Sequence, residues 1–138
     1  MHKRLSPPQA LIYAMITTAA VDRQITDPEL SRIGSLVKEL PAFAGYGGDW
    51  LLEEAQACGR LLAKPPNGME TVLNLVREAL PAELHETAYV LCAEVAASDL
   101  EVRDEEVRFI DKLAEKLGLD DLVCAALQRA ARARHMRA

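Results

Sequence analysis

Acidic side chains recur at matching places in two short turns of this sequence. Residues 19–30 read Ala-Ala-Val-Asp-Arg-Gln-Ile-Thr-Asp-Pro-Glu-Leu, and residues 96–107 read Ala-Ala-Ser-Asp-Leu-Glu-Val-Arg-Asp-Glu-Glu-Val. Carboxylate oxygens grouped in one turn are the ligands that calcium, magnesium and manganese prefer, whereas zinc favours nitrogen and sulfur. The pattern therefore makes divalent cation binding the first chemistry to consider.

Four of the acids have a structural explanation. Asp27 and Asp104 begin predicted helices, where a side-chain oxygen accepts hydrogen bonds from the first backbone N–H groups. Glu29 and Glu106 fall in the first helical turns, where negative charge suits the helix dipole. Thr26 and Glu29 also fit a capping box, in which each side chain accepts from the other residue's N–H group.

Asp22 and Asp99 are placed differently. Each lies at the C-terminal end of the preceding helix, where the dipole is negative and a carboxylate is unfavourable. A positively charged or hydrogen-bond-donating group is therefore expected beside each of these carboxylates. It could be the N–H groups of an Asx turn, a lysine or arginine from elsewhere, or a metal ion that draws Asp22 together with Asp27 or Glu29. An EF-hand loop is excluded, because its twelfth position requires Glu and the sequence has Ile33 and Ile110 there.

The elements that must position these acids are predicted to be helices. The seven prolines fall where helices begin or end, and no segment alternates polar and apolar residues over the length of a strand. Apolar residues at helical spacing predict helices over residues 7–21, 27–40, 50–63, 69–80, 82–98, 104–117 and 120–135. Ser6 is the expected N-cap of the first, amphipathic helix, and Gly118 the expected C′ residue of the sixth. We expect a single all-α domain over residues 1–138.

The two acidic turns belong to a duplicated helix-loop-helix unit. Residues 13–40 align with residues 90–117 without a gap and share eight identical residues. Thr17 in the first unit stands where the second has Glu94.

The charge is distributed unevenly along the chain. The 16 Lys and Arg and 21 Asp and Glu give a net charge of −5, yet the basic C-terminal end, residues 129–138, holds four arginines and no acid. Because an acidic body repels phosphate backbones, nucleic acid is not an expected partner. The basic end is expected to complement the dipole of the last helix.

Catalytic and targeting motifs are missing. The glycine-rich loop at 41–48 lacks the Gly-Lys-[Ser/Thr] ending of a phosphate-binding loop, and the run 85–89, His-Glu-Thr-Ala-Tyr, lacks the second histidine of a metalloprotease. Cys58, Cys92 and Cys124 form no Cys-x-x-Cys pair and are expected to be buried. We expect no enzymatic activity and no organic cofactor. With no signal sequence or membrane-spanning run, we expect a cytoplasmic protein without direct membrane insertion.

At the duplicated turns the chain resembles the tellurite resistance TerB family, whose members carry an Ala-x-x-Asp-Gly-x-[Ile/Val]-x-x-x-Glu unit near each end of an all-helical domain. The first unit corresponds to residues 13–40 and the second to residues 88–119, preceded by Leu-Pro-x-Glu-Leu at 80–84. The resemblance implies a TerB-like helical fold and an accessory or sensor role in tellurite or general chemical stress. It also implies protein partners in a membrane-linked complex with integral membrane and calcium-binding members, at the inner face of the membrane.

The resemblance further implies that the repeated acids bind a divalent ion, which would be calcium, magnesium or manganese. The residues concerned are Asp22, Asp27, Glu29, Glu94, Asp99, Asp104 and Glu106.

Two other hypotheses come from different functional classes. The chain could be a metal-free helical adaptor that binds a protein partner through an apolar groove, or through the loop at 41–48 with Phe43, Tyr46 and Trp50. It could also be a metal-dependent hydrolase built on the second acidic cluster around Asp99.

Overall fold

Helices are the regular structure of this chain in the computed structural model, which describes residues 4–21, 25–46, 51–98 and 104–138. In chain order the elements are α1 (Pro7–Ala20), α2 (Asp27–Glu39), the 3-10 helix η1 (Pro41–Phe43), α3 (Leu51–Ala63), α4 (Gly68–Ala79), the 3-10 helix η3 (Ala82–Leu84), α5 (His85–Ala97), α6 (Asp104–Leu117) and α7 (Asp121–Arg134). No strand occurs in these ranges. The all-α prediction and the number of long helices are confirmed.

The predicted caps set the helix ends. Ser6 Oγ accepts from the Gln9 N–H at 3.3 Å, and the Gln9 side chain accepts from the Ser6 N–H at 2.9 Å, which closes a capping box. Gly118 takes φ +69°, and the Leu119 N–H donates to Ala114 O at 3.0 Å, as in a Schellman motif. The largest difference is at α5, which begins at His85 and not at residue 82, because a 3-10 turn follows Pro81.

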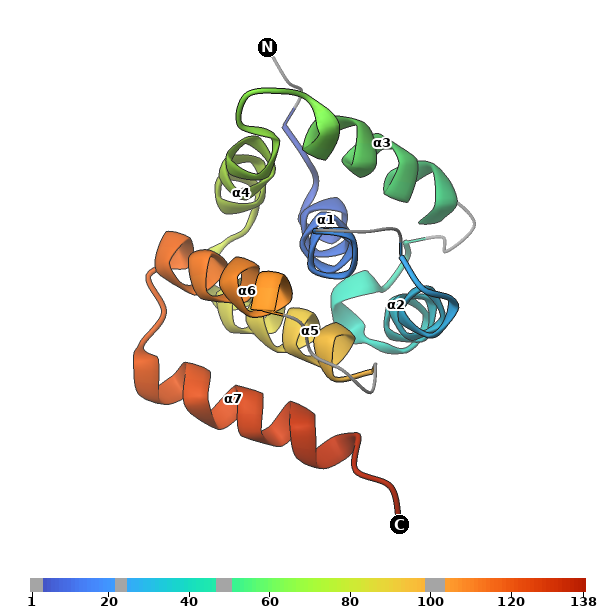
Figure 1. Cartoon of the computed structure of the whole chain (residues 1–138), viewed down its shortest axis with the longest axis vertical. Helices are drawn as coiled ribbons and strands as arrows, with labels where there is room; N and C mark the ends of the chain where they lie inside the picture. The colour runs from blue at the N-terminus through green and yellow to red at the C-terminus, as the bar shows by residue number, and fades with distance from the viewer. Residues whose placement is uncertain (1–3, 22–24, 47–50, 99–103) are drawn as a thin grey trace.

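α1 lies at the centre of the molecule and packs against α2, α3, α4, α5 and α6 (Figure 1). Residues 10–19 are all buried, so the prediction of an amphipathic first helix was wrong: α1 is enclosed on every side. The hydroxyls of Thr17 and Thr18 are satisfied inside the core, donating to Tyr13 O at 2.8 Å and to Ala14 O at 2.9 Å. No helix in the described part of the chain is long and apolar enough to cross a membrane.

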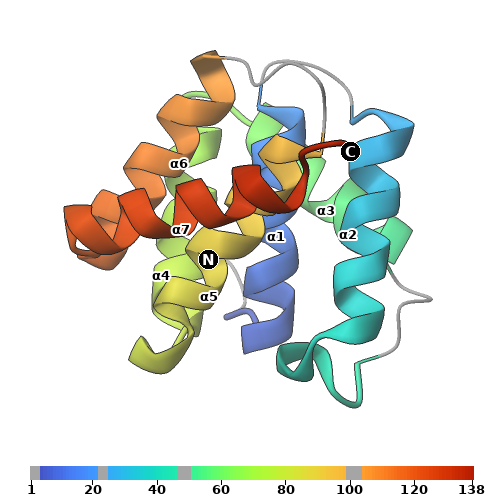
Figure 2. The same cartoon turned by 90° about the horizontal axis from the view of Figure 1, so that it is seen from below.

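The duplicated units pack on one another in a matching way. α2 packs on both α1 and α5, and α6 packs on both α5 and α1. α3 and α4 cover α1, whereas α7 covers α5 (Figures 1 and 2). Among the described elements, α5 is the only one with which α7 makes extensive contact. α7 therefore lies across α5 on the outside of the bundle, and its position depends on contacts with that one helix.

Gly68 allows α4 to begin directly against the end of α3. A Cβ atom at this position would lie 2.2 Å from Leu62 O and 2.6 Å from Leu61 O, both backbone atoms. Gly59 on α3 contrasts with it, because a Cβ there would meet nothing within 4 Å. The two positions form a matched pair for testing this junction.

Replacing Gly68 with alanine is expected to lower the free energy of unfolding by about 1–3 kcal/mol, because the helix ends must move apart. Gly59→Ala is expected to raise it by about 0.5–1 kcal/mol, since alanine favours a helix interior. Urea denaturation of the two variants measures both values. Equal effects at the two positions would contradict the close approach at Gly68.

Candidate functional site

Glu94, one of the predicted metal ligands, contacts the basic end of the chain. Its carboxylate accepts a hydrogen bond from Arg134 Nε through Oε1, and its Oε2 lies 3.3 Å from His135 Nε2. The Glu94 side chain is 5% exposed, against 64% for Arg134 and 14% for His135. Removing a carboxylate from water is costly unless it is paired, so this contact stabilises both the burial of Glu94 and the position of the chain end.

A second contact holds the middle of α7. The Gln128 side chain donates from Nε2 to Tyr89 Oη at 2.6 Å. Tyr89 is the residue that replaces the second histidine in the metalloprotease-like run, and burial raises the pKa of its hydroxyl to about 12. Together with Glu94, Tyr89 attaches α7 to α5 at two points along its length.

The other predicted acids that the structure describes lie in the first turns of α2 and α6. Glu29 Oε1 accepts from the Thr26 N–H at 3.0 Å and from Thr26 Oγ1 at 2.9 Å, which confirms the capping box. Glu106 occupies the matching place in the first turn of α6, and both glutamates are fully buried. Asp27 and Asp104 are the exposed first residues of α2 and α6. The N-cap of α2 is Thr26, so the prediction that the Asp27 side chain accepts from the first backbone N–H groups was wrong.

The metal hypothesis depends on two residues, Asp22 and Asp99, that lie outside the described residues. Within the described ranges, no three His, Cys, Asp or Glu side chains gather into a group that could hold a metal ion. Divalent ion binding at the duplicated turns stays a prediction.

The loop proposed to contact a partner is in part a core element. Phe43 is buried in η1, and Tyr46 is half-buried against the core, while Trp50 lies outside the described residues. The aromatic side chain of Phe43 is therefore not available to a partner.

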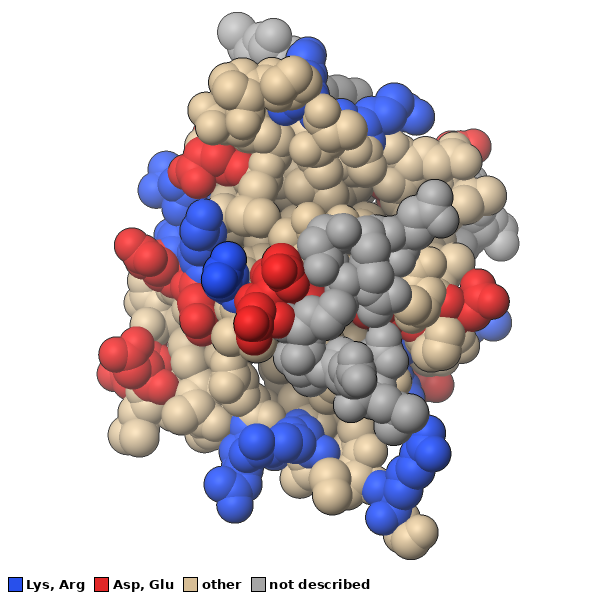
Figure 3. All heavy atoms as spheres, in the orientation of Figure 1, with Lys and Arg blue, Asp and Glu red and all other residues tan. Residues whose placement is uncertain are grey.

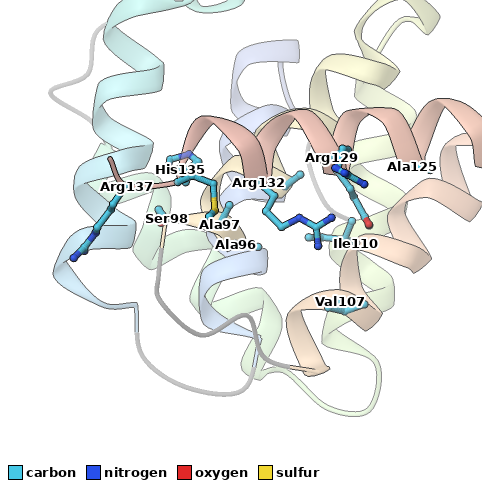
Figure 4. A pocket seen from close by; sticks show the side chains of 13 residues that line it. Ala96, Ala97, Ser98, Val107, Ile110, Ala125, Arg129, Arg132, His135 and Arg137 are labelled. Carbon is cyan, nitrogen blue, oxygen red and sulfur yellow. The ribbon is translucent and has the colours of Figure 1, made fainter.

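A groove of about 800 Å³ opens between α6 and α7, above the C-terminal half of α5 (Figure 4). Ala93 and Ala96 of α5 and Ile110 of α6 line it and are each at most 5% exposed, so its deepest part is apolar. Val107 of α6 and Met136 after α7 add exposed apolar surface. The small alanine side chains leave space above α5 that neither neighbouring helix fills.

Three arginines give the groove a positive border. Arg129, Arg132 and Arg137 line it, and none of them forms an ion pair with a residue that the structure describes. In Figure 3, Lys and Arg side chains gather along the lower edge of the molecule, over α7 and the chain end. We call this feature, with its floor at Ala93, Ala96 and Ile110 and its three arginines, the arginine groove.

The sequence contained a signal for this groove. Ala125, Arg129, Arg132 and Met136 follow one another at intervals of three or four residues, which places them on one side of a helical stretch. Arg132 and Arg134 occupy the last turn of α7, which is the placement that the sequence predicted for residues complementing the helix dipole. Which side of α7 faces the groove could not be predicted, because it depends on how α7 crosses α5.

The cysteines offer no reactive thiolate. All three are buried, as predicted, and burial raises the pKa of the Cys58 and Cys92 thiols from 9.0 to about 12. Burial also raises the pKa of Cys124. Since the thiolate is the nucleophilic form, these groups are unreactive near neutral pH.

These pKa shifts predict a loss of stability in alkaline solution. Below pH 9 the thiol of Cys92 is protonated in both the folded and the unfolded chain, so it adds no pH dependence. Between pH 9 and about 12 only the unfolded chain loses the proton, which lowers the free energy of unfolding. Denaturation at pH 8 and pH 10.5 measures the loss, and Cys92→Ala is expected to lose less. An equal loss in the variant would contradict the shift.

Comparison of the chain with models of protein families, with curated proteins and with solved structures finds no match. The resemblance to the TerB family therefore depends on the duplicated motif.

Proposed function

We propose that this chain is a non-enzymatic helical adaptor that binds a segment of a partner protein in the arginine groove. The observation that carries the proposal is the combination of an apolar floor with three arginines that have no ion-pair partner among the described residues. An apolar floor stabilises a bound segment by removing apolar surface from water. The arginines select a segment that carries acidic groups beside its apolar face.

An amphipathic helix fits this groove best. α6 and α7 form its sides, and the alanines of α5 permit the close approach that helix packing requires. A helix with apolar residues at i, i+3, i+4 and i+7 would face the floor, and glutamates on its flanks would meet Arg129 and Arg132.

The TerB resemblance supplies the cellular setting of the proposal. In that setting the protein is an accessory component of a tellurite or general stress response, and the groove joins it to a membrane-linked complex through a partner. Divalent cation binding at the duplicated turns is the second candidate function. It rests on the acids that recur at matching places in the two turns of the sequence.

Binding of a fluorescein-labelled amphipathic peptide, with leucines on one face and glutamates on both flanks, tests the adaptor function by fluorescence anisotropy. The double variant Arg129→Glu, Arg132→Glu is expected to weaken binding by roughly a hundredfold, because it replaces two attractions with repulsions. Arg77→Glu on α4 is the matched control, since Arg77 is exposed and does not line the groove.

A control peptide and two further outcomes distinguish the candidate functions. A peptide with lysines in place of the glutamates is expected not to bind. Equal affinity of the wild-type protein and the double variant would refute the arginine groove as the binding site. An affinity that appears only with calcium or manganese, and is lost in EDTA, would favour the second candidate function.

A further inference from the structure

A second, smaller pocket of about 250 Å³ lies between α2 and the residues that follow α7. Ser31, Arg32 and Ser35 line it from one side of α2, and Ser98 and His135 line it from the ends of α5 and α7. The C-terminus passes beside α2 in Figure 2, and the close-up shows His135 and Ser98 near one another (Figure 4). The pocket therefore brings together three segments that are distant in the sequence.

Most of the polar groups around this pocket are hydrogen-bond donors. Arg32 is half-buried and forms no ion pair with a described residue, so its guanidinium N–H groups remain available. The hydroxyls of Ser31 and Ser35 have no hydrogen-bond partner in the described part of the chain. Ser98 is different, because its hydroxyl already donates to Val95 O at 2.6 Å.

His135 contributes one ring nitrogen. Its Nε2 faces Glu94, and its Nδ1 has no hydrogen-bond partner among the residues that the structure describes. The charge of Glu94 is met by Arg134, and none of the described residues that line the pocket is acidic. Nothing described in the pocket therefore competes with an external anion for Arg32.

We propose that this pocket binds an oxyanion, which is a phosphate or carboxylate group of a ligand. The planar guanidinium of Arg32 offers two parallel N–H groups that match two oxygens of either anion, and the serine hydroxyls supply further donors. The proposal goes beyond the adaptor function and does not require a partner in the arginine groove. A bound anion would connect α2 to the end of α7. Without it, α5 is the one described helix on which α7 packs extensively.

NMR titration of the whole chain tests this site, with inorganic phosphate in one arm and acetate in the other. Saturable chemical-shift changes are expected at Ser31, Arg32, Ser35 and His135, with millimolar affinity. Tighter binding of phosphate than of acetate would identify a phosphate group as the ligand, and the reverse order would identify a carboxylate. Arg32→Gln is expected to weaken binding by roughly tenfold or more, because the charge-assisted hydrogen bonds are lost.

Arg77→Gln, on the exposed surface of α4, is the matched control and is expected to bind phosphate as the wild-type protein does. Ser35→Ala gives a second test if Arg32→Gln does not fold, and is expected to weaken binding by roughly threefold. Shifts that do not saturate, shifts spread over all basic residues, or equal affinity in Arg32→Gln and the wild-type protein would overturn the proposal.

Discussion

A buried carboxylate on α5 determines where the basic end of the chain lies. Glu94 is almost fully enclosed, and its two oxygens face Arg134 and His135. A carboxylate in this position is costly without such partners, so the end of α7 is held against α5. The arginine groove and the pocket at Arg32 both include residues of this chain end, so both depend on that contact.

The two duplicated units make chemically different contacts at equivalent positions. Thr17 occupies on α1 the place that Glu94 occupies on α5, and its hydroxyl lies 3.4 Å from Cys58 Sγ on α3. Thr17 contacts Cys58, and Glu94 contacts His135. The two contacted residues are as far apart in the sequence as Thr17 and Glu94 are, so the contacts correspond in the two halves of the chain. Each unit thus uses this position to contact its covering helix. The first contact is neutral and fully buried, whereas the second is charged and lies beside a groove.

Local chemistry in the sequence was sufficient to predict the seven long helices, but not the 3-10 helices η1 and η3. Prolines mark the helix starts, and the caps at Ser6, Thr26 and Gly118 act through neighbouring residues only. The enclosure of α1 could not be predicted in this way, because it depends on five other helices. Glu94 was predicted as a metal ligand from the motif, and the structure places it against Arg134.

The candidate sites likewise depend on contacts between distant segments, which local sequence patterns do not show. The arginines of the basic end were visible in the sequence, but their place beside alanines of α5 follows from the crossing of α7 over α5. Arg32 had no recognisable role, because its neighbours Ser98 and His135 are far along the chain. The metal prediction is carried by Asp22 and Asp99, which lie outside the described residues.

Amide hydrogen exchange in the wild-type protein and in Glu94→Gln tests most directly whether Glu94 holds the chain end. The substitution keeps the shape of the side chain and removes its charge. We expect the amides of residues 128–134 to exchange faster in the variant, while those of residues 10–19 in the central helix keep their rates. Unchanged exchange along α7 in Glu94→Gln would contradict the role assigned to this carboxylate.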